Sequence, residues 1–543
     1  MVAGRRILSF LLALFLTVTL TACGSAGSDT ANAGAADAGA KTMNIGATDE
    51  VGTLNPLKMD MSFINHYSAG LVFLPLVSFS ANYGLNYLLA DSITTEDNRT
   101  FTIHIKDSAA WSDGEAVKSD DVIFTYRKLS TAEIRNVNFN FSILEGINGD
   151  GTWPEGKDSV SGLKKIDEKT LEVKTVNSMG LNTFINGVAS WVNILPSHAL
   201  KDIPDEELLS SPWFDSPDVV SGPYMISEFV PGSHVYYKSN ENYFMGAPKI
   251  GNLNIICTSP KELLTKLKSG ELDFVHPAMA NFQAEDRKEL ESLKEGRAFY
   301  ADPITNEMTF FNTRKIPDAR VRKAFVLAID RERILEEFLD GKGEISDGFI
   351  CSKSPYFDEE KKNIPYDPAE AKRLLAEAGW DSGRTLEYYV NSSDISMVRT
   401  AEEAKKYLAE VGIEINVHSV DFPTLMELGG SDEVDVFSVQ YTVLPIDYYS
   451  DEASLINSDP SWTGGYTDAA VAEALMATQN STDEAKIKAA YNAIDRRMIE
   501  DVPMFSMYFV GNIGVVGDRL MNAEPTFYGA FDNIQEWDLE LKE

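Results

Sequence analysis

The sequence predicts a mixed α/β fold divided into more than one lobe, and three features carry this prediction. The chain has 543 residues, which is too long for a single hydrophobic core and implies two or three domains. Residues 101–105 alternate as a half-buried strand, and a turn at 112–114 leads from them into a helix that begins near Ser119. Residues 386–417 read as strand, helix and strand, the order of a parallel α/β unit with a right-handed crossover.

Residues 1–22 are expected to be a signal peptide and not part of the fold. Arg5 and Arg6 precede an apolar run that is too short to span a bilayer comfortably. The run ends in Leu-Thr-Ala-Cys, which resembles a bacterial lipobox, and this resemblance implies cleavage before Cys23 and acylation of that cysteine. An ordinary secretory signal with a chance cysteine is the alternative.

Residues 23–42 are expected to be the lipid anchor and a flexible linker, because they are rich in Ser, Ala and Gly and lack apolar periodicity. Two or more acyl chains on Cys23 give stable attachment, where one chain would be marginal. No later apolar run reaches transmembrane length. We therefore expect an extracytoplasmic body at the outer face of the cell membrane, or in the periplasmic space if there are two membranes.

Composition limits the partners and the redox chemistry. The formal net charge of −35 is spread along the chain, which argues against nucleic acid or anionic lipid as a partner, because both need a basic surface. Beyond Cys23 only Cys257 and Cys351 remain. One disulfide in an oxidising compartment and two free thiols are both compatible with them.

The remaining elements follow from local signals. A strand opens at Met43, and residues 170–173 form part of another strand pair. Asp367 as N-cap, Pro368 at the first helical position and Gly379 as C-cap specify a helix by themselves. Residues 434–439 form the next strand of the second half.

Seven segments, in chain order, are similar to sequence motifs of one family: 53–56, 111–126 (WSDGEAVKSDDVIFTY), 194–198, 221–224, 270–274, 318–331 and 366–380. They resemble the large extracytoplasmic solute-binding proteins of family 5, the oligopeptide-, dipeptide- and nickel-binding lipoproteins that serve ABC importers. The resemblance implies a two-lobed periplasmic-binding-protein fold, of type II and of the large cluster C form. It has mixed sheets and an extra domain inserted in lobe I.

The resemblance also implies the domain boundaries. Lobe I is expected to consist of three segments, 43–75, 185–277 and 501–543. A small inserted domain, 76–184, would interrupt lobe I, and lobe II would span 278–500. The chain would cross between the lobes near His276 and again near Tyr508.

The ligand contacts implied by the resemblance are Asp60, Met61, His276, Asn306, Tyr441, Asp447 and Tyr508. The sequence departs from the family where peptide-binding members carry a Trp and an amine-binding Asp, because Tyr441 and Leu444 stand there. Asp447 either takes over the role of that Asp, or the ligand has no free ammonium group. Backbone groups near Thr305 would pair with an extended peptide.

The function that this resemblance implies is capture of di- or oligopeptides by hinge closure and delivery to a permease with cytoplasmic ATPases. We expect a monomer without cofactor or metal and without enzymatic activity, since the chain has no HExxH, G-x-S-x-G or Walker pattern. The alternatives are a nickel chelate, an opine or an oligosaccharide as solute. A secreted hydrolase with paired carboxylates and a structural or adhesive lipoprotein are further alternatives.

Overall fold

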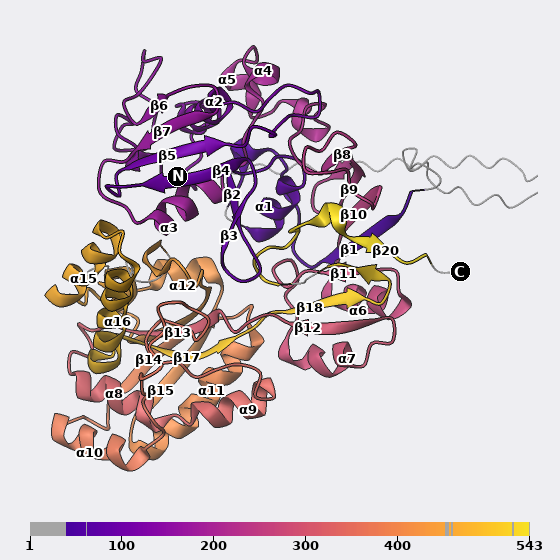
Figure 1. Ribbon diagram of the computed structural model, residues 1–543. Coiled ribbons are helices and arrows are strands. Elements are labelled where there is room, and N and C mark those ends of the chain that lie inside the picture. The colour runs from indigo at the N-terminus through magenta and orange to yellow at the C-terminus, as the bar shows by residue number, and fades with distance from the viewer. Residues whose placement is uncertain (1–39, 61, 451–455, 458–459, 524–525, 542–543) are drawn as a thin grey trace, which may run out of the picture.

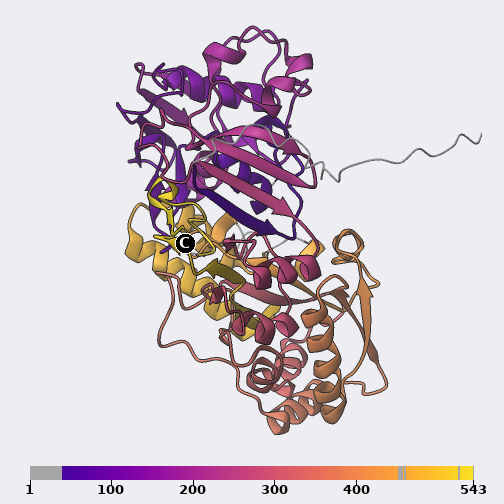
Figure 2. The same ribbon diagram turned by 90° about the vertical axis from the view of Figure 1, so that its right-hand side faces the viewer.

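The computed structural model describes residues 40–541, apart from residue 61 and residues 451–455, 458–459 and 524–525. Two large sheets organise the molecule, one in each lobe (Figure 1). Figure 2 shows lobe I, coloured indigo to magenta, above the orange lobe II. The expected two-lobed α/β architecture is therefore confirmed.

The sheet of lobe I is mixed and has seven strands. In sheet order they are β12 (Gly296–Tyr300), β18 (Ile513–Gly517), β11 (Phe274–Val275), β1 (Thr42–Ala47), β10 (Asn252–Cys257), β9 (His234–Ser239) and β8 (Tyr224–Val230). The helices of this lobe include α1 (Phe63–Gly70), α4 (Ser197–Leu200), α5 (Asp205–Leu208), α6 (Pro260–Ser269) and α7 (Arg287–Glu291). β1 pairs in parallel with β10 and β11, so the N-terminal strand lies inside the sheet.

The sheet of lobe II has five strands, in the order β15 (Glu414–Val420), β14 (Thr385–Asn391), β16 (Val436–Thr442), β13 (Thr305–Phe311) and β17 (Met504–Val510). Its helices include α8 (Ala319–Ala328), α9 (Arg331–Leu339), α10 (Pro368–Ala378), α11 (Ile395–Val411), α12 (Phe422–Leu428), α15 (Ala469–Asn480) and α16 (Glu484–Asp501). β14 and β15 are parallel and joined through α11, which confirms the expected strand-helix-strand unit. Asp367 caps α10 by accepting from Glu370 N at 2.9 Å, and Gly379 ends it at φ 67°.

A small sheet lies within the stretch expected to be an inserted domain. Its strands, in order, are β4 (Ala90–Thr95), β5 (Thr100–Ile105), β7 (Thr170–Lys174) and β6 (Leu163–Lys165), with the hairpin β2 (Val77–Phe79) and β3 (Leu85–Tyr87) beside them in sequence. Helix α2 (Ser119–Ser130) accompanies this sheet. Phe101 of β5 stacks on Phe184 with ring centroids 3.8 Å apart, which ties the sheet to helix α3 (Leu181–Phe184).

Two of the sequence motifs are joined to each other by hydrogen bonds in the structure. α2 begins at Ser119 as expected, and Asp121 caps its start, because its Oδ2 accepts from Lys118 N at 2.8 Å. Its Oδ1 accepts from the amide and hydroxyl of Ser197 at 2.9 and 2.6 Å. His198 Nε2 lies 2.9 Å from Asp113 Oδ2, so the segments 111–126 and 194–198 are held together as one unit.

The chain crosses between the lobes later than the sequence boundaries suggested. β11 stays in the sheet of lobe I, and the chain forms α7 and β12 there before it crosses at 301–304. β17 belongs to the sheet of lobe II, so the return crossing is at 511–512. The reason is strand pairing: β12 and β18 complete the edge of the seven-stranded sheet as an antiparallel pair on either side of the crossings.

The two crossings touch each other. Ala301 N donates to Asn512 O at 2.9 Å, and the Thr305 hydroxyl donates to Asn512 Oδ1 at 2.8 Å. Asp302 connects both lobes, because it accepts from the Tyr83 hydroxyl at 2.8 Å and pairs with Lys353 at 2.7 Å. The crossings therefore form a narrow hinge at one edge of the lobe contact.

Gly511 is needed where the crossings meet, because a Cβ at this position would lie 1.8 Å from Ala301 O. We expect Gly511→Ala to push the crossings apart and to lower the free energy of unfolding by about 1–3 kcal/mol, as overpacking does. Gly149→Ala is the control, since a Cβ there meets open space and should change stability by less than about 0.5 kcal/mol. Equal urea midpoints for the two variants would contradict the expectation.

The cysteines and the helices answer two open questions. Cys257 is half-buried and Cys351 is buried, and no disulfide joins them, so the disulfide alternative does not apply. Cys351 Sγ lies 3.3 Å from the Tyr448 hydroxyl. Within the described ranges, the structure contains no helix with the length and apolar character needed to cross a membrane.

Candidate functional site

Asp447 forms the centre of a hydrogen-bonded bridge between the lobes. Its Oδ1 accepts from the Thr183 hydroxyl at 2.8 Å, and its Oδ2 accepts from Asn186 Nδ2 at 3.1 Å and from the Ser450 hydroxyl at 2.6 Å. Thr183 and Asn186 lie on α3 and the π-helix η3 (Ile185–Ser190) that continues it. The carboxylate is 1% exposed, so its charge is balanced by donors from both lobes and not by water.

Further polar contacts extend this bridge on both sides. Asn182 Nδ2 donates to Ile446 O at 2.9 Å, and Gly180 N donates to Gln479 Oε1 at 2.9 Å. Asn98 Nδ2 donates to the carbonyls of Gln479 and Ser481 at 3.0 and 2.9 Å. These contacts hold α15 and the loop after β16 against α3.

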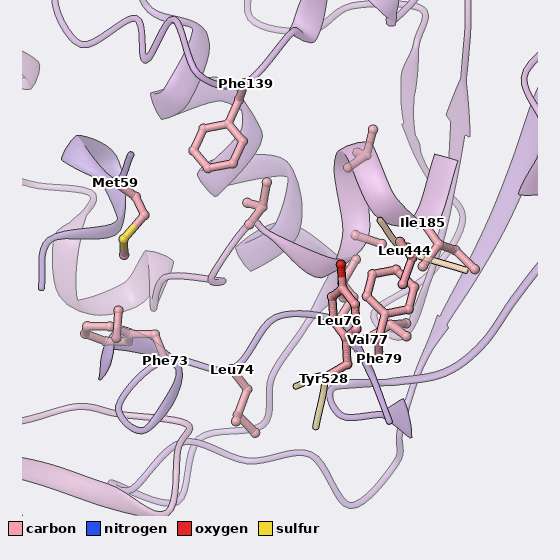
Figure 3. Packing of buried hydrophobic residues seen from close by; sticks show 14 of the residues in the cluster. Met59, Phe73, Leu74, Leu76, Val77, Phe79, Phe139, Ile185, Leu444 and Tyr528 are labelled. Carbon is pink, nitrogen blue, oxygen red and sulfur yellow. The ribbon is translucent and has the colours of Figure 1, made fainter. Parts of the chain in front are cut away.

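An apolar contact lies beside the polar bridge. Leu444 of lobe II belongs to the same buried cluster as Ile185, Phe79 and Tyr528 of lobe I, and Figure 3 shows these side chains together. Leu444 is 1% exposed. The position that carries an amine-binding Asp in peptide-binding relatives, according to the sequence resemblance, is therefore part of an apolar contact in this protein.

A cavity of about 120 Å³ lies in lobe I next to this contact. It is lined by α1, by the β2–β3 hairpin, by Trp191 and by the C-terminal segment 528–535. The walls are largely aromatic: Phe63, Tyr67, Trp191, Tyr528 and Phe531. Trp191 packs on His66 with ring centroids 4.4 Å apart, and its indole donates to Asn186 Oδ1 at 3.2 Å. Asn186 thus links the cavity wall to Asp447.

Three polar side chains with few hydrogen-bond partners are among the residues that line this cavity. His66 Nδ1 and Ser78 Oγ are buried without a hydrogen-bond partner, and burial lowers the pKa of His66 to about 4, so its imidazole is neutral at pH 7. The carboxylate of Asp532 accepts a hydrogen bond in this environment, from Asn86 Nδ2 at 2.8 Å to Oδ1. Burial raises the pKa of Asp532 to about 6.

A second, smaller cavity of about 60 Å³ lies at the hinge, between the crossings and α11. Thr305, Gln440, Tyr508 and Asp394 are among its lining residues. Gln440 and Tyr508 flank Glu307 in the strand register. Glu307 is fully buried, and neither carboxylate oxygen has a partner with hydrogen-bonding geometry. Burial raises its pKa to about 8, and a weaker interaction with the Tyr508 hydroxyl lowers it only in part.

The structure brings together the expected ligand residues of lobe II. Asn306 and Tyr441 are direct partners in the β13–β16 register, and Tyr508 lies on the neighbouring strand beside Glu307. Asn306 is buried and accepts from the Ser506 hydroxyl at 2.6 Å, while its Nδ2 has no partner. The Tyr508 hydroxyl shares a hydrogen bond of 3.0 Å with the Thr400 hydroxyl.

The expected residues of lobe I lie apart from this group. Asp60 is exposed, and its Oδ1 accepts from Ser62 of the same loop and from Asn65 of the adjacent helix α1. His276 is buried, its Nε2 lies 2.7 Å from Thr526 O, and its Nδ1 accepts from Ala278 N at 3.0 Å. Burial lowers the pKa of His276 to about 3, so in this conformation the ring has no free nitrogen for a ligand. Met61 lies outside the described residues.

Sequence reasoning missed the residues that line the lobe I cavity, above all His66, Trp191 and Asp532. The C-terminal run 527–533, with three aromatic residues and one Asp among seven, was a signal that could have been noticed. His66 and Trp191 carried no local signal, because their roles depend on contacts between α1 and η3. No group of three or more His, Cys, Asp or Glu suited to a metal occurs in the part of the chain that the structure describes.

Comparison with known proteins identifies the fold and the family. The profile of the bacterial extracellular solute-binding proteins, family 5 (middle), matches residues 84–483. The oligopeptide-binding protein AppA of Bacillus subtilis is 23% identical over 474 residues, which is 83% of this chain and 82% of that protein. The periplasmic oligopeptide-binding protein OppA of Escherichia coli is 23% identical over 456 residues, covering 79% of this chain and 80% of that one.

Two solved structures share the fold at low sequence identity. The substrate-binding protein CtaP of Listeria monocytogenes superposes with a TM-score of 0.78 at 19% identity, over 92% of this chain and 99% of that one. NikZ of Campylobacter jejuni in complex with Ni(L-His) gives 0.71 at 20% identity, over 91% and 99%. Since the family profile spans well over half of the sequence, the chain belongs to the bacterial extracellular solute-binding proteins of family 5, as its motifs indicated.

Proposed function

We propose that this protein captures peptides outside the cytoplasm by closing its two lobes over them, and that it delivers them to the permease of an ABC importer. The observation that carries the proposal is the two-lobed architecture with a hinge of two crossings and a polar bridge at Asp447. The relatives support a peptide as the solute, because AppA and OppA are named as oligopeptide-binding proteins. AppA of Bacillus subtilis has also been solved with a nonapeptide, and its structure superposes with a TM-score of 0.70.

The physical mechanism is a hinge. Rotation about 301–304 and 511–512 separates or joins the hydrogen-bonding groups of Thr183, Asn186 and Asp447. A solute drives closure only by contacts that exist in the closed form and not in the open one. Tyr441, which is half-buried and is the register partner of the buried Asn306, supplies a side chain for such contacts.

The remaining parts of the proposal concern attachment and chemistry. Cys23, outside the described residues, is the proposed acylated cysteine, and residues 24–42 would tether the body to the membrane. The protein works as a monomer that binds and releases its solute, and no bond of the solute is broken. The permease and its cytoplasmic ATPases supply the transport step.

Binding can be tested on protein freed of its solute by unfolding and refolding. We expect a pool of peptides to raise the melting temperature, since ligand at one hundred times its Kd stabilises a protein by about 2.7 kcal/mol. Small-angle scattering should show a smaller radius of gyration with peptide, and mass spectrometry should recover the peptides intact. A shift with nickel-histidine or an oligosaccharide alone would replace the peptide by that solute, and shortened peptides would indicate a hydrolase.

A further inference from the structure

Asp532 is a carboxylate at the wall of the lobe I cavity without a positively charged partner. Its recorded hydrogen-bond donor is the neutral amide of Asn86, and no Lys or Arg is among the described residues that line the cavity. A carboxylate taken largely out of water is costly unless it is paired or strongly hydrogen-bonded. The Asp532 carboxylate would therefore be stabilised by a positively charged group bound in the cavity.

The walls of the cavity suit a cation as well. Phe63, Tyr67 and Trp191 lie on one side, and Tyr528 and Phe531 come from the C-terminal segment. The faces of aromatic rings attract an organic cation within about 6 Å of their centroids. The cavity, at about 120 Å³, is comparable with the roughly 150 Å³ that accommodates a benzene molecule in a protein core. It has room for an alkylammonium group with part of its chain.

Acceptors for the hydrogens of such a group are also present. An ammonium group has three N–H donors. His66 Nδ1 and Ser78 Oγ line the same cavity as Asp532, and both are buried without a partner. Since the His66 ring is neutral, a nitrogen that carries no proton can accept a hydrogen bond. Two unpartnered acceptor atoms therefore belong to side chains that line the same cavity as Asp532.

Lobe II offers no equivalent site at the expected place. Leu444 is buried in an apolar contact. Asp447 is already saturated by Thr183, Asn186 and Ser450. A cation that approached Asp447 would have to displace donors that hold the two lobes together.

We propose that the lobe I cavity binds an ammonium group of the captured solute, with Asp532 as its counter-ion and His66 and Ser78 as further acceptors. The inference rests on the proposed function and adds the chemical class that the solute must carry. It also connects capture to closure: Trp191 forms part of the cavity wall and donates to Asn186, whose amide group donates to Asp447. An occupied cavity and a formed lobe bridge therefore share one side chain, Asn186.

The test uses the full chain, freed of solute, and three sets of alanine peptides of several lengths. One set has a free N-terminus, one is N-acetylated, and one is N-acetylated with a single internal lysine. By titration calorimetry we expect the wild type to bind the first or the third set at least about tenfold more tightly than the neutral second set. Preference for the first set identifies the peptide N-terminus as the source, and preference for the third identifies a side chain.

Asp532→Asn keeps the shape of the side chain and should abolish this preference for charged peptides. Asp202→Asn removes the same charge from an exposed turn and should leave the preference intact. Ser78→Ala removes a hydroxyl without a partner and should weaken binding of the charged set several-fold, which provides a second readout if Asp532→Asn misfolds.

Each result separates this inference from the broader one. If the wild type binds neutral and charged peptides equally, or if Asp532→Asn retains the preference, peptide capture stands and the ammonium site is wrong. If the wild type binds no peptide of any set, both proposals fail.

Discussion

Replacing Asp447 by alanine is expected to lower the free energy of unfolding by about 3–5 kcal/mol. The carboxylate accepts hydrogen bonds from Thr183, Asn186 and Ser450 while almost fully buried. A hydrogen bond to a charged group contributes about 1.5–3 kcal/mol, and a buried donor that loses its acceptor costs about 1–3 kcal/mol. Because two of the donors belong to the other lobe, we also expect the lobes to separate in part.

Two measurements check this expectation. Urea denaturation gives the loss of stability, and small-angle scattering gives a larger radius of gyration for Asp447→Ala than for the wild type. Asp202→Ala is the control, because Asp202 is exposed in a turn, and surface changes of this kind stay within about 0.5 kcal/mol. A variant that matches the wild type in both measurements would show that the bridge does not hold the lobes together.

Glu307→Gln is expected to stabilise the protein at alkaline pH, by about 2–4 kcal/mol at pH 9. In the unfolded chain a glutamate loses its proton near pH 4.5, whereas burial raises the pKa of Glu307 to about 8 in the folded protein. Between these two pH values the folded state binds more protons than the unfolded state, so the stability of the wild type falls as pH rises. Glutamine cannot ionise and avoids this loss.

The measurement is the difference in unfolding free energy between Glu307→Gln and the wild type from pH 5 to pH 9. The difference should be small at pH 5, grow as pH rises and level off above about pH 8. Glu402→Gln is the matched control, because this substitution removes the same charge from a glutamate that is exposed on α11. A difference that does not vary with pH would mean that Glu307 is ionised in the folded protein across this range.

Particular segments show which parts of the fold can be predicted from the sequence and which cannot. Asp367, Pro368 and Gly379 specified α10 because capping and φ preferences act within a few residues. The β14–α11–β15 unit followed from periodicity for the same reason. The late crossings at 301–304 and 511–512 could not be predicted, because the two-residue strand β11 and the edge strand β12 are defined by their partners. Strand pairing over more than 200 residues leaves no local pattern.

The candidate site divides in the same way. The sequence singled out Asp447, Asn306, Tyr441 and Tyr508 by resemblance, and the structure places all four in lobe II, three of them on neighbouring strands. It did not reveal that Asp447 is saturated by donors from α3 and η3, since those donors lie more than 250 residues away in the chain.

By itself, the sequence determined the family, the α/β class and most individual helices, because these depend on short-range periodicity, helix capping and short sequence motifs. Only the tertiary structure decided which carboxylates have partners within the protein and which remain available to a ligand. Asp447, Asp532 and Glu307 are chemically similar groups, and the sequence does not distinguish them. Their burial and partners do: donors from both lobes satisfy Asp447, aromatic walls leave Asp532 without a cation, and strand packing raises the pKa of Glu307. Solvation and pairing are properties of the assembled fold, since they depend on residues that meet only when the chain is folded.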